Sequence, residues 1–75
     1  MKNANHYLFN ARTDHANIGV SNKDFDKGLR EFRKLAMNMD GNAEYSLHVI
    51  NSHGETERVV VDYNPWKENQ VAPKV

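Results

Sequence analysis

The chain contains no cysteine among its 75 residues. Neither a disulfide nor a thiolate-bound metal can therefore stabilise it, and its composition is compatible with the cytosol. A chain of this length forms one domain at most and buries only about 60–65% of its unfolded surface. We therefore expect a single domain of modest stability.

The chain also lacks an excess of charge and a long apolar run. Ten basic and ten acidic residues cancel, whereas general nucleic-acid coats and acidic DNA mimics carry a large charge of one sign. No apolar stretch approaches the roughly 18 residues that cross a membrane, and residues 1–6 are not followed by the apolar core of a secretory signal. The sequence predicts a soluble, cytoplasmic protein.

Catalytic and metal-binding motifs are missing as well. There is no Gly-x-Ser-x-Gly, no P-loop and no glycine-rich dinucleotide turn. The carboxylates are spread along the chain without pairing, and the histidines His6, His15, His48 and His53 lack the spacing of a metal site. The sequence therefore predicts a protein that is not an enzyme and that holds neither a cofactor nor a metal.

The most informative segment that is present spans residues 23–39. At roughly 100° per residue its apolar side chains form one stripe of a helix, which consists of Phe25, Leu29, Phe32 and Ala36. The stripe behind it is basic and consists of Lys23, Lys27, Arg30 and Lys34, with Arg33 at its margin. We expect Ser21 to cap the start of this helix and Gly41 to end it. Gly28, which weakens a helix, is expected to mark a close approach to a sheet.

Four β-prone segments surround this helix. Residues 6–11, 17–20, 44–51 and 57–63 alternate between apolar and polar side chains, and residues 51–55 supply a hairpin turn that contains Gly54. The sequence thus predicts an α+β fold of order ββαββ, in which one helix covers one face of a four-stranded antiparallel sheet. Residues 1–66 form the domain, and residues 67–75 are expected to be a flexible, disordered tail.

The alternation assigns side chains to the two faces of the sheet. The face toward the helix is expected to hold Tyr7, Phe9, Ile18, Val20, Tyr45, Leu47, Val49, Val59, Val61 and Tyr63. The opposite face is expected to hold Leu8, His48, Ile50 and Val60 among polar residues. A one-residue slip in any strand would exchange the two sets.

Two surfaces are candidate binding sites. The first is the uncovered sheet face with Leu8, His48, Ile50 and Val60, which suits a protein partner or a second copy of the chain. Trp66, just beyond the last strand, is expected to pack on the end of the sheet or on the helix; its alternative role is to anchor a protein partner as a secondary contact. The alternative is the basic helix stripe, which would contact nucleic acid with weak specificity because it lacks residues that read base edges. Both surfaces also have a purely structural explanation. The apolar residues of the sheet face are then scattered surface side chains, and the basic stripe is the solvated back of an amphipathic helix.

No motif of the chain identifies a family. In its size, its lack of catalytic groups and its ββαββ pattern, the chain is similar to the small accessory proteins that bacteriophages and other mobile elements use to bind host machinery. That similarity implies a small interaction protein that binds a host macromolecule or itself.

Overall fold

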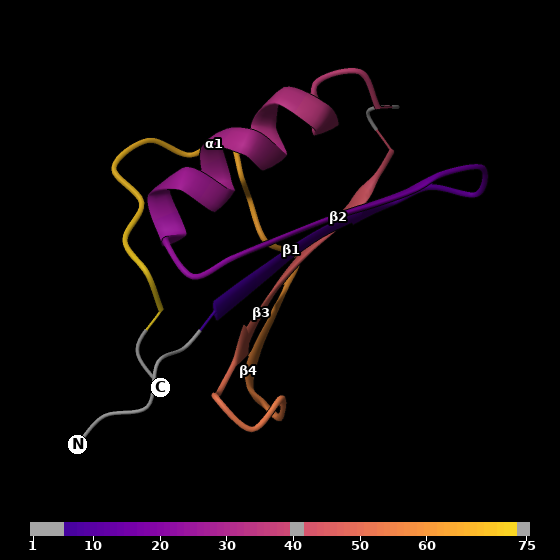
Figure 1. The fold of residues 1–75 in the computed structure, drawn as a ribbon. Coiled ribbons are helices and arrows are strands. Elements are labelled where there is room, and N and C mark those ends of the chain that lie inside the picture. The colour runs from indigo at the N-terminus through magenta and orange to yellow at the C-terminus, as the bar shows by residue number, and fades with distance from the viewer. Residues whose placement is uncertain (1–5, 40–41, 74–75) are drawn as a thin grey trace.

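The computed structural model describes residues 6–39 and 42–73 of the chain. Strands β1 (His6–Arg12) and β2 (Asn17–Asn22) form one hairpin, and β3 (Glu44–Ile50) and β4 (Thr56–Val61) form a second. Helix α1 (Phe25–Ala36) connects the two hairpins (Figure 1). The strands form one antiparallel sheet in the order β2-β1-β3-β4. The predicted ββαββ architecture is confirmed.

Both hairpin turns are held by side chains of their own residues. The Thr13 hydroxyl accepts hydrogen bonds from the backbone N–H groups of His15 and Ala16, at 3.2 and 3.0 Å. In the second turn the side chain of Asn51 accepts from two backbone N–H groups, and Gly54 has a φ of +81°. The positive φ explains the glycine that the sequence placed in this turn.

The helix begins three residues later than predicted. Ser21 lies in β2, and the cap is Asp24, whose Oδ1 accepts the Lys27 N–H at 3.1 Å. The Asn22 side chain accepts the Asp24 N–H at 2.8 Å and so shapes the turn between strand and helix. The N-cap prediction was wrong because β2 continues past Val20. The predicted end at Gly41 lies outside the described residues, and α1 itself ends at Ala36 with Met37 as its C-cap.

The core lies between α1 and one face of the sheet. Phe9 of β1 is fully buried, and its ring centroid lies 5.5 Å from Phe25, 5.6 Å from Phe32 and 6.1 Å from Tyr63. The predicted apolar stripe of the helix is confirmed, since all its members are buried: Phe25, Leu29, Phe32 and Ala36. From the sheet they meet Phe9, Ala11, Val20 and Leu47.

Gly28 lets the helix approach this core. A Cβ at this position would lie 2.8 Å from Phe9 Cε1 and 3.1 Å from Asn22 Cβ.

We expect Gly28→Ala to lower the free energy of unfolding by about 1 kcal/mol. The overpacking costs about 1–3 kcal/mol and exceeds the gain of about 1 kcal/mol in helix propensity. Urea denaturation of the variant measures this loss. Lys27→Ala, at the exposed neighbouring position, is the matched control and should change stability little, whereas a more stable Gly28→Ala variant would contradict the close approach.

The face assignment of β4 differs from the prediction. Val60 lies opposite the buried Leu47, so it faces the helix side, whereas Val59 and Val61 lie opposite His48 and Ser46 on the other face. The expectation that Val60 lies on the uncovered face, with Val59 and Val61 beneath the helix, was therefore wrong.

Two irregularities of β4 explain this exchange. Val49 pairs with Arg58 but Ile50 pairs with Thr56, so the strand gains one residue at its start. At its end Asp62 has a φ of +52°, and the Tyr63 N–H donates to the Tyr45 carbonyl oxygen at 3.1 Å. Such an extra residue acts as a bulge and reverses the alternation. Tyr63 and Val60 therefore both pack against the core although they are three residues apart.

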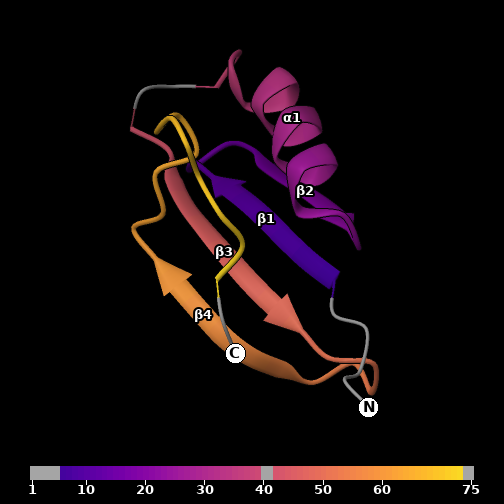
Figure 2. The same ribbon diagram turned by 90° about the vertical axis from the view of Figure 1, so that its left-hand side faces the viewer.

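Two elements share the cover of the inner sheet face. Helix α1 lies over β1 and β2, and the C-terminal segment (residues 64–73) passes over β3 and β4 on the same side of the sheet (Figures 1 and 2). Pro65 is fully buried, and Ala72 packs against the core. The helix alone therefore does not cover the face that the sequence assigned to it.

Hydrogen bonds connect the C-terminal segment to the fold. Arg33 of α1 donates from Nε to the Pro65 carbonyl oxygen at 2.6 Å and from Nη2 to that of Lys67 at 2.9 Å. The Tyr63 hydroxyl donates to Oε1 of Gln70, whose Nε2 donates in turn to backbone carbonyls. Burial raises the pKa of Tyr63 to about 12, although Arg33 and Gln70 act in the opposite direction. The contacts above describe the position of the C-terminal segment and not its motion. The flexibility predicted for residues 67–75 therefore stays a prediction.

Candidate functional site

The side of the sheet that faces away from α1 is the outer face. Pairing across the strands places its side chains in rows, of which two span all four strands. One row runs from Ser21 through Leu8 and His48 to Val59. The second row runs from Gly19 through Asn10 and Ser46 to Val61. Neither α1 nor the C-terminal segment covers these rows, because both lie on the other side.

Apolar side chains are concentrated at the β3–β4 half of the outer face. Leu8, His48 and Ile50 are half-buried, and Val59 and Val61 are 47% and 69% exposed. The structure thus brings together three of the residues that the sequence predicted for this surface, and it replaces Val60 by its two neighbours. The three consecutive valines at residues 59–61 indicated an apolar strand. A run without alternation does not show which of its side chains face outward.

Polar groups surround this apolar area. His48 Nε2 lies 3.4 Å from Ser46 Oγ, and at the far end Arg12 and Glu44 form an ion pair at 3.3 Å. Both members of the pair are well exposed, so it contributes little to stability. A shallow hollow of about 280 Å³ lies beside the pair, lined by Asn10, Arg12, Asn17, Glu44, Tyr45, Ser46, Val61 and Asp62. The outer face is therefore apolar toward its β4 edge, polar elsewhere along its margin and balanced in charge.

Trp66 does not belong to this surface. Its ring stands perpendicular to that of Tyr45, with centroids 6.3 Å apart, and Tyr45 packs in turn on Phe32 of α1. Trp66 therefore lies on the helix side of the sheet, where it is 45% exposed. The expectation that Trp66 packs on the sheet or the helix is therefore confirmed. As a secondary contact for a partner it would lie on the opposite side of the sheet from Leu8, His48 and Ile50. The chain returns across the covered face after β4, and strand periodicity does not report that path.

The basic helix stripe is smaller than the sequence indicated. Lys23 precedes the N-cap and is not part of α1, and Arg33 is engaged by the carbonyls of the C-terminal segment. The remaining exposed cations of the stripe are Lys27, Arg30 and Lys34. Nucleic-acid binding by this stripe stays a prediction that now depends on these three residues.

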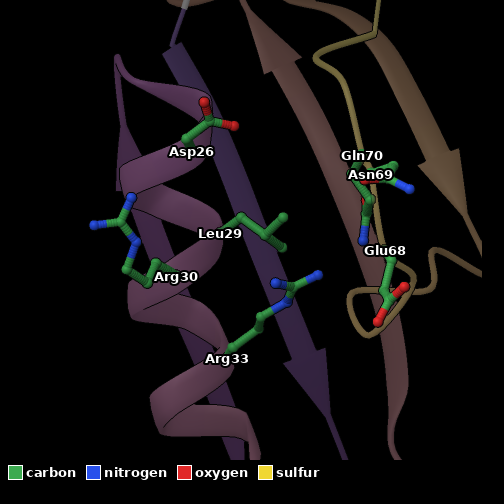
Figure 3. Close-up of a pocket in the computed structure, with 7 residues that line it drawn as sticks. All are labelled: Asp26, Leu29, Arg30, Arg33, Glu68, Asn69 and Gln70. Atoms are coloured by element: carbon green, nitrogen blue, oxygen red, sulfur yellow. The ribbon is translucent and has the colours of Figure 1, made fainter.

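A groove of about 460 Å³ separates α1 from the C-terminal segment. It is lined by Asp26, Leu29, Arg30, Arg33, Glu68, Asn69 and Gln70. Figure 3 shows that Arg33 extends from the helix toward the segment, whereas Arg30 extends away from it. The sequence did not indicate this groove, because it forms only where the C-terminal segment runs beside the helix. Its lining combines both signs of charge, and Arg33 already donates two hydrogen bonds across it.

Within residues 6–39 and 42–73, no group of three or more histidine or carboxylate side chains is placed to hold a metal ion. In the same ranges no helix has the length and apolar character needed to traverse a bilayer.

Comparison with known proteins adds no further site. No protein-family model matches this chain, and neither a curated protein nor a solved structure matches it.

Proposed function

We propose that the chain is a small, non-enzymatic interaction protein that binds a protein partner through the outer face of its sheet. The observation that carries this proposal is the exposure of Val59 and Val61 on a face that neither α1 nor the C-terminal segment covers. Burying apolar area is worth roughly 25 cal/mol per Å², so these side chains favour a surface that removes them from water.

The arrangement of the outer face resembles that of protein interfaces. Leu8, Val59 and Val61 form an apolar area that extends to the β4 edge, and the Arg12–Glu44 pair lies at the far margin. An apolar area bordered by polar groups is typical of surfaces that bind proteins. A phosphate backbone would instead favour an excess of positive charge, which this face lacks.

The size of the outer face limits the strength of binding. Strands lie about 4.8 Å apart and rise about 3.3 Å per residue, so four strands of six residues present roughly 400 Å². A stable interface buries about 800 Å² on each partner. We therefore infer a transient interaction, unless the partner also contacts the sheet margins.

Charged substitutions at the two valines test this proposal. We expect Val59→Lys combined with Val61→Lys to weaken partner binding at least tenfold, because each lysine places a charge where the partner removes water. The experiment is affinity capture from a lysate of the source cell with quantitative mass spectrometry, followed by calorimetric titration of the captured protein.

The matched control carries Lys27→Glu and Lys34→Glu on the exposed side of α1. It should retain the partner that the valine variant loses. Loss of the partner in the helix variant alone would overturn the proposal and favour the basic stripe. Titration of both variants with single-stranded and double-stranded oligonucleotides then tests the nucleic-acid alternative.

A further inference from the structure

The two edges of the sheet differ in how they are protected. β4 carries the charges of Glu57 and Arg58, a register shift at its start and a positive φ just after its end, at Asp62. Charges and bulges are the devices by which natural proteins prevent strand addition at an edge. β2 pairs with β1 without a break from Asn22 to Asn17, and its sequence NIGVSN contains neither a charged residue nor a proline. β2 is therefore the open edge of this sheet.

An exposed leucine lies on the helix beside that edge. The flank of α1 that holds Gly28 faces β2, because a Cβ on Gly28 would lie 3.1 Å from Asn22 Cβ. Leu35 follows seven residues later, which returns it to about the same flank. Arg33, on the other flank, binds the C-terminal segment. Leu35 is 46% exposed, so an apolar side chain stands unprotected above the β2 edge.

We propose that β2 is a self-association edge, on which the β2 strand of a second copy adds in the antiparallel direction. The two-fold axis of this dimer passes through Gly19, so that Ile18 of each copy lies opposite Val20 of the other. Both side chains are on the helix side of the sheet, and Val20 is buried in the core. Antiparallel pairing about such an axis keeps both helices on the same side of a continuous eight-stranded sheet.

The position of Leu35 selects Gly19 as the centre. α1 runs back along β2, because the short connection of Lys23 and Asp24 joins the end of the strand to the start of the helix. Seven helical residues advance about 10 Å, and three strand residues cover about the same distance. Since Gly28 lies beside Asn22, these distances put Leu35 at the level of Gly19 along the strand. The Leu35 side chains of the two copies therefore meet at the axis.

The spacing of the two helices fits this arrangement. α1 packs on both β1 and β2. With strands about 4.8 Å apart, a helix over the β1–β2 pair lies about 5 Å from the axis. The two helix axes are then roughly 10 Å apart, within the 8–10 Å range of packed helices. The chain has no net charge, so long-range repulsion does not oppose the pairing.

Sedimentation equilibrium over a wide range of concentration tests this proposal. The wild-type chain should form a dimer, and Leu35→Lys and Leu35→Glu should each weaken dimerisation more than tenfold, because like charges meet at the axis. A mixture of the two variants should restore a dimer that contains one copy of each, since opposite charges then face one another. Recovery on mixing also shows that each variant is folded.

Met37→Lys is the matched control, because Met37 is an exposed residue on the helix flank of Arg33. This variant should dimerise like the wild type. A wild-type chain that stays monomeric at every concentration would overturn the proposal. A dimer that persists in both Leu35 variants would also overturn it. If the double variant Val59→Lys with Val61→Lys disrupts the dimer instead, self-association belongs to the outer face.

Discussion

Phe9→Ala is expected to lower the melting temperature by more than about 15 °C. Phe9 is fully buried and lies within 6.1 Å of the rings of Phe25, Phe32 and Tyr63, measured between centroids. Removing a buried phenylalanine costs about 3–5 kcal/mol, which is a large part of the stability of a domain this small. In such a domain each kcal/mol shifts the midpoint by roughly 4–8 °C.

Leu8→Ala is the control for this prediction. Leu8 is the preceding residue of β1, but it lies half-buried on the outer face. Its truncation should cost about 1 kcal/mol, since only part of the side chain is removed from water. Thermal unfolding followed by circular dichroism compares the two variants. Equal shifts would mean that β1 is not placed with Phe9 inward.

Arg33→Ala is expected to release the C-terminal segment and to lower the free energy of unfolding by about 2 kcal/mol. The guanidinium donates to the carbonyls of Pro65 and Lys67, and hydrogen bonds from charged donors contribute about 1.5–3 kcal/mol each. The Lys67 carbonyl keeps a second donor from Gln70, whereas that of Pro65 loses its donor. The loss at Pro65 therefore dominates the effect.

The fluorescence of Trp66 reports this release directly, because it is the only tryptophan of the chain. We expect a shift of its emission to longer wavelength and faster amide hydrogen exchange in residues 66–72. Arg33→Lys should show most of the same change, because a single ammonium group cannot replace the planar guanidinium, whose Nε and Nη2 donate to two separate carbonyl oxygens. Arg30→Ala, whose side chain extends away from the segment, should leave the emission unchanged. An unchanged spectrum in Arg33→Ala would show that other contacts hold the segment.

The parts of the fold that follow from local periodicity could be predicted from the sequence. Phe25, Leu29, Phe32 and Ala36 recur at helical spacing, and a helix with one apolar side needs a sheet to cover it. β1 and β3 alternate without interruption, so their inward residues were assigned correctly. In these segments the local pattern and the tertiary packing favour the same structure.

The remaining features depend on contacts that no local pattern contains. The faces of β4 are set by an added residue at its start and by the backbone of Asp62 at its end. The partners of Arg33 lie more than thirty residues away in a segment without periodicity. For the outer face, the predicted place of Leu8, His48 and Ile50 was correct, whereas Val60 was misplaced because it follows such an irregularity.

The order of strands in the sheet also determines how this chain must fold. β1 is translated first, yet one of its two neighbours is β3, which pairs Glu44 with Arg12 and Ile50 with His6. The first hairpin and α1 can form early from local contacts, but β1 gains its second neighbour only after β3 has been made. Closing such long loops slows folding. On the ribosome the inner edge of β1 therefore stays open until β3 has left the exit tunnel, and this interval is when the chain is most exposed to aggregation.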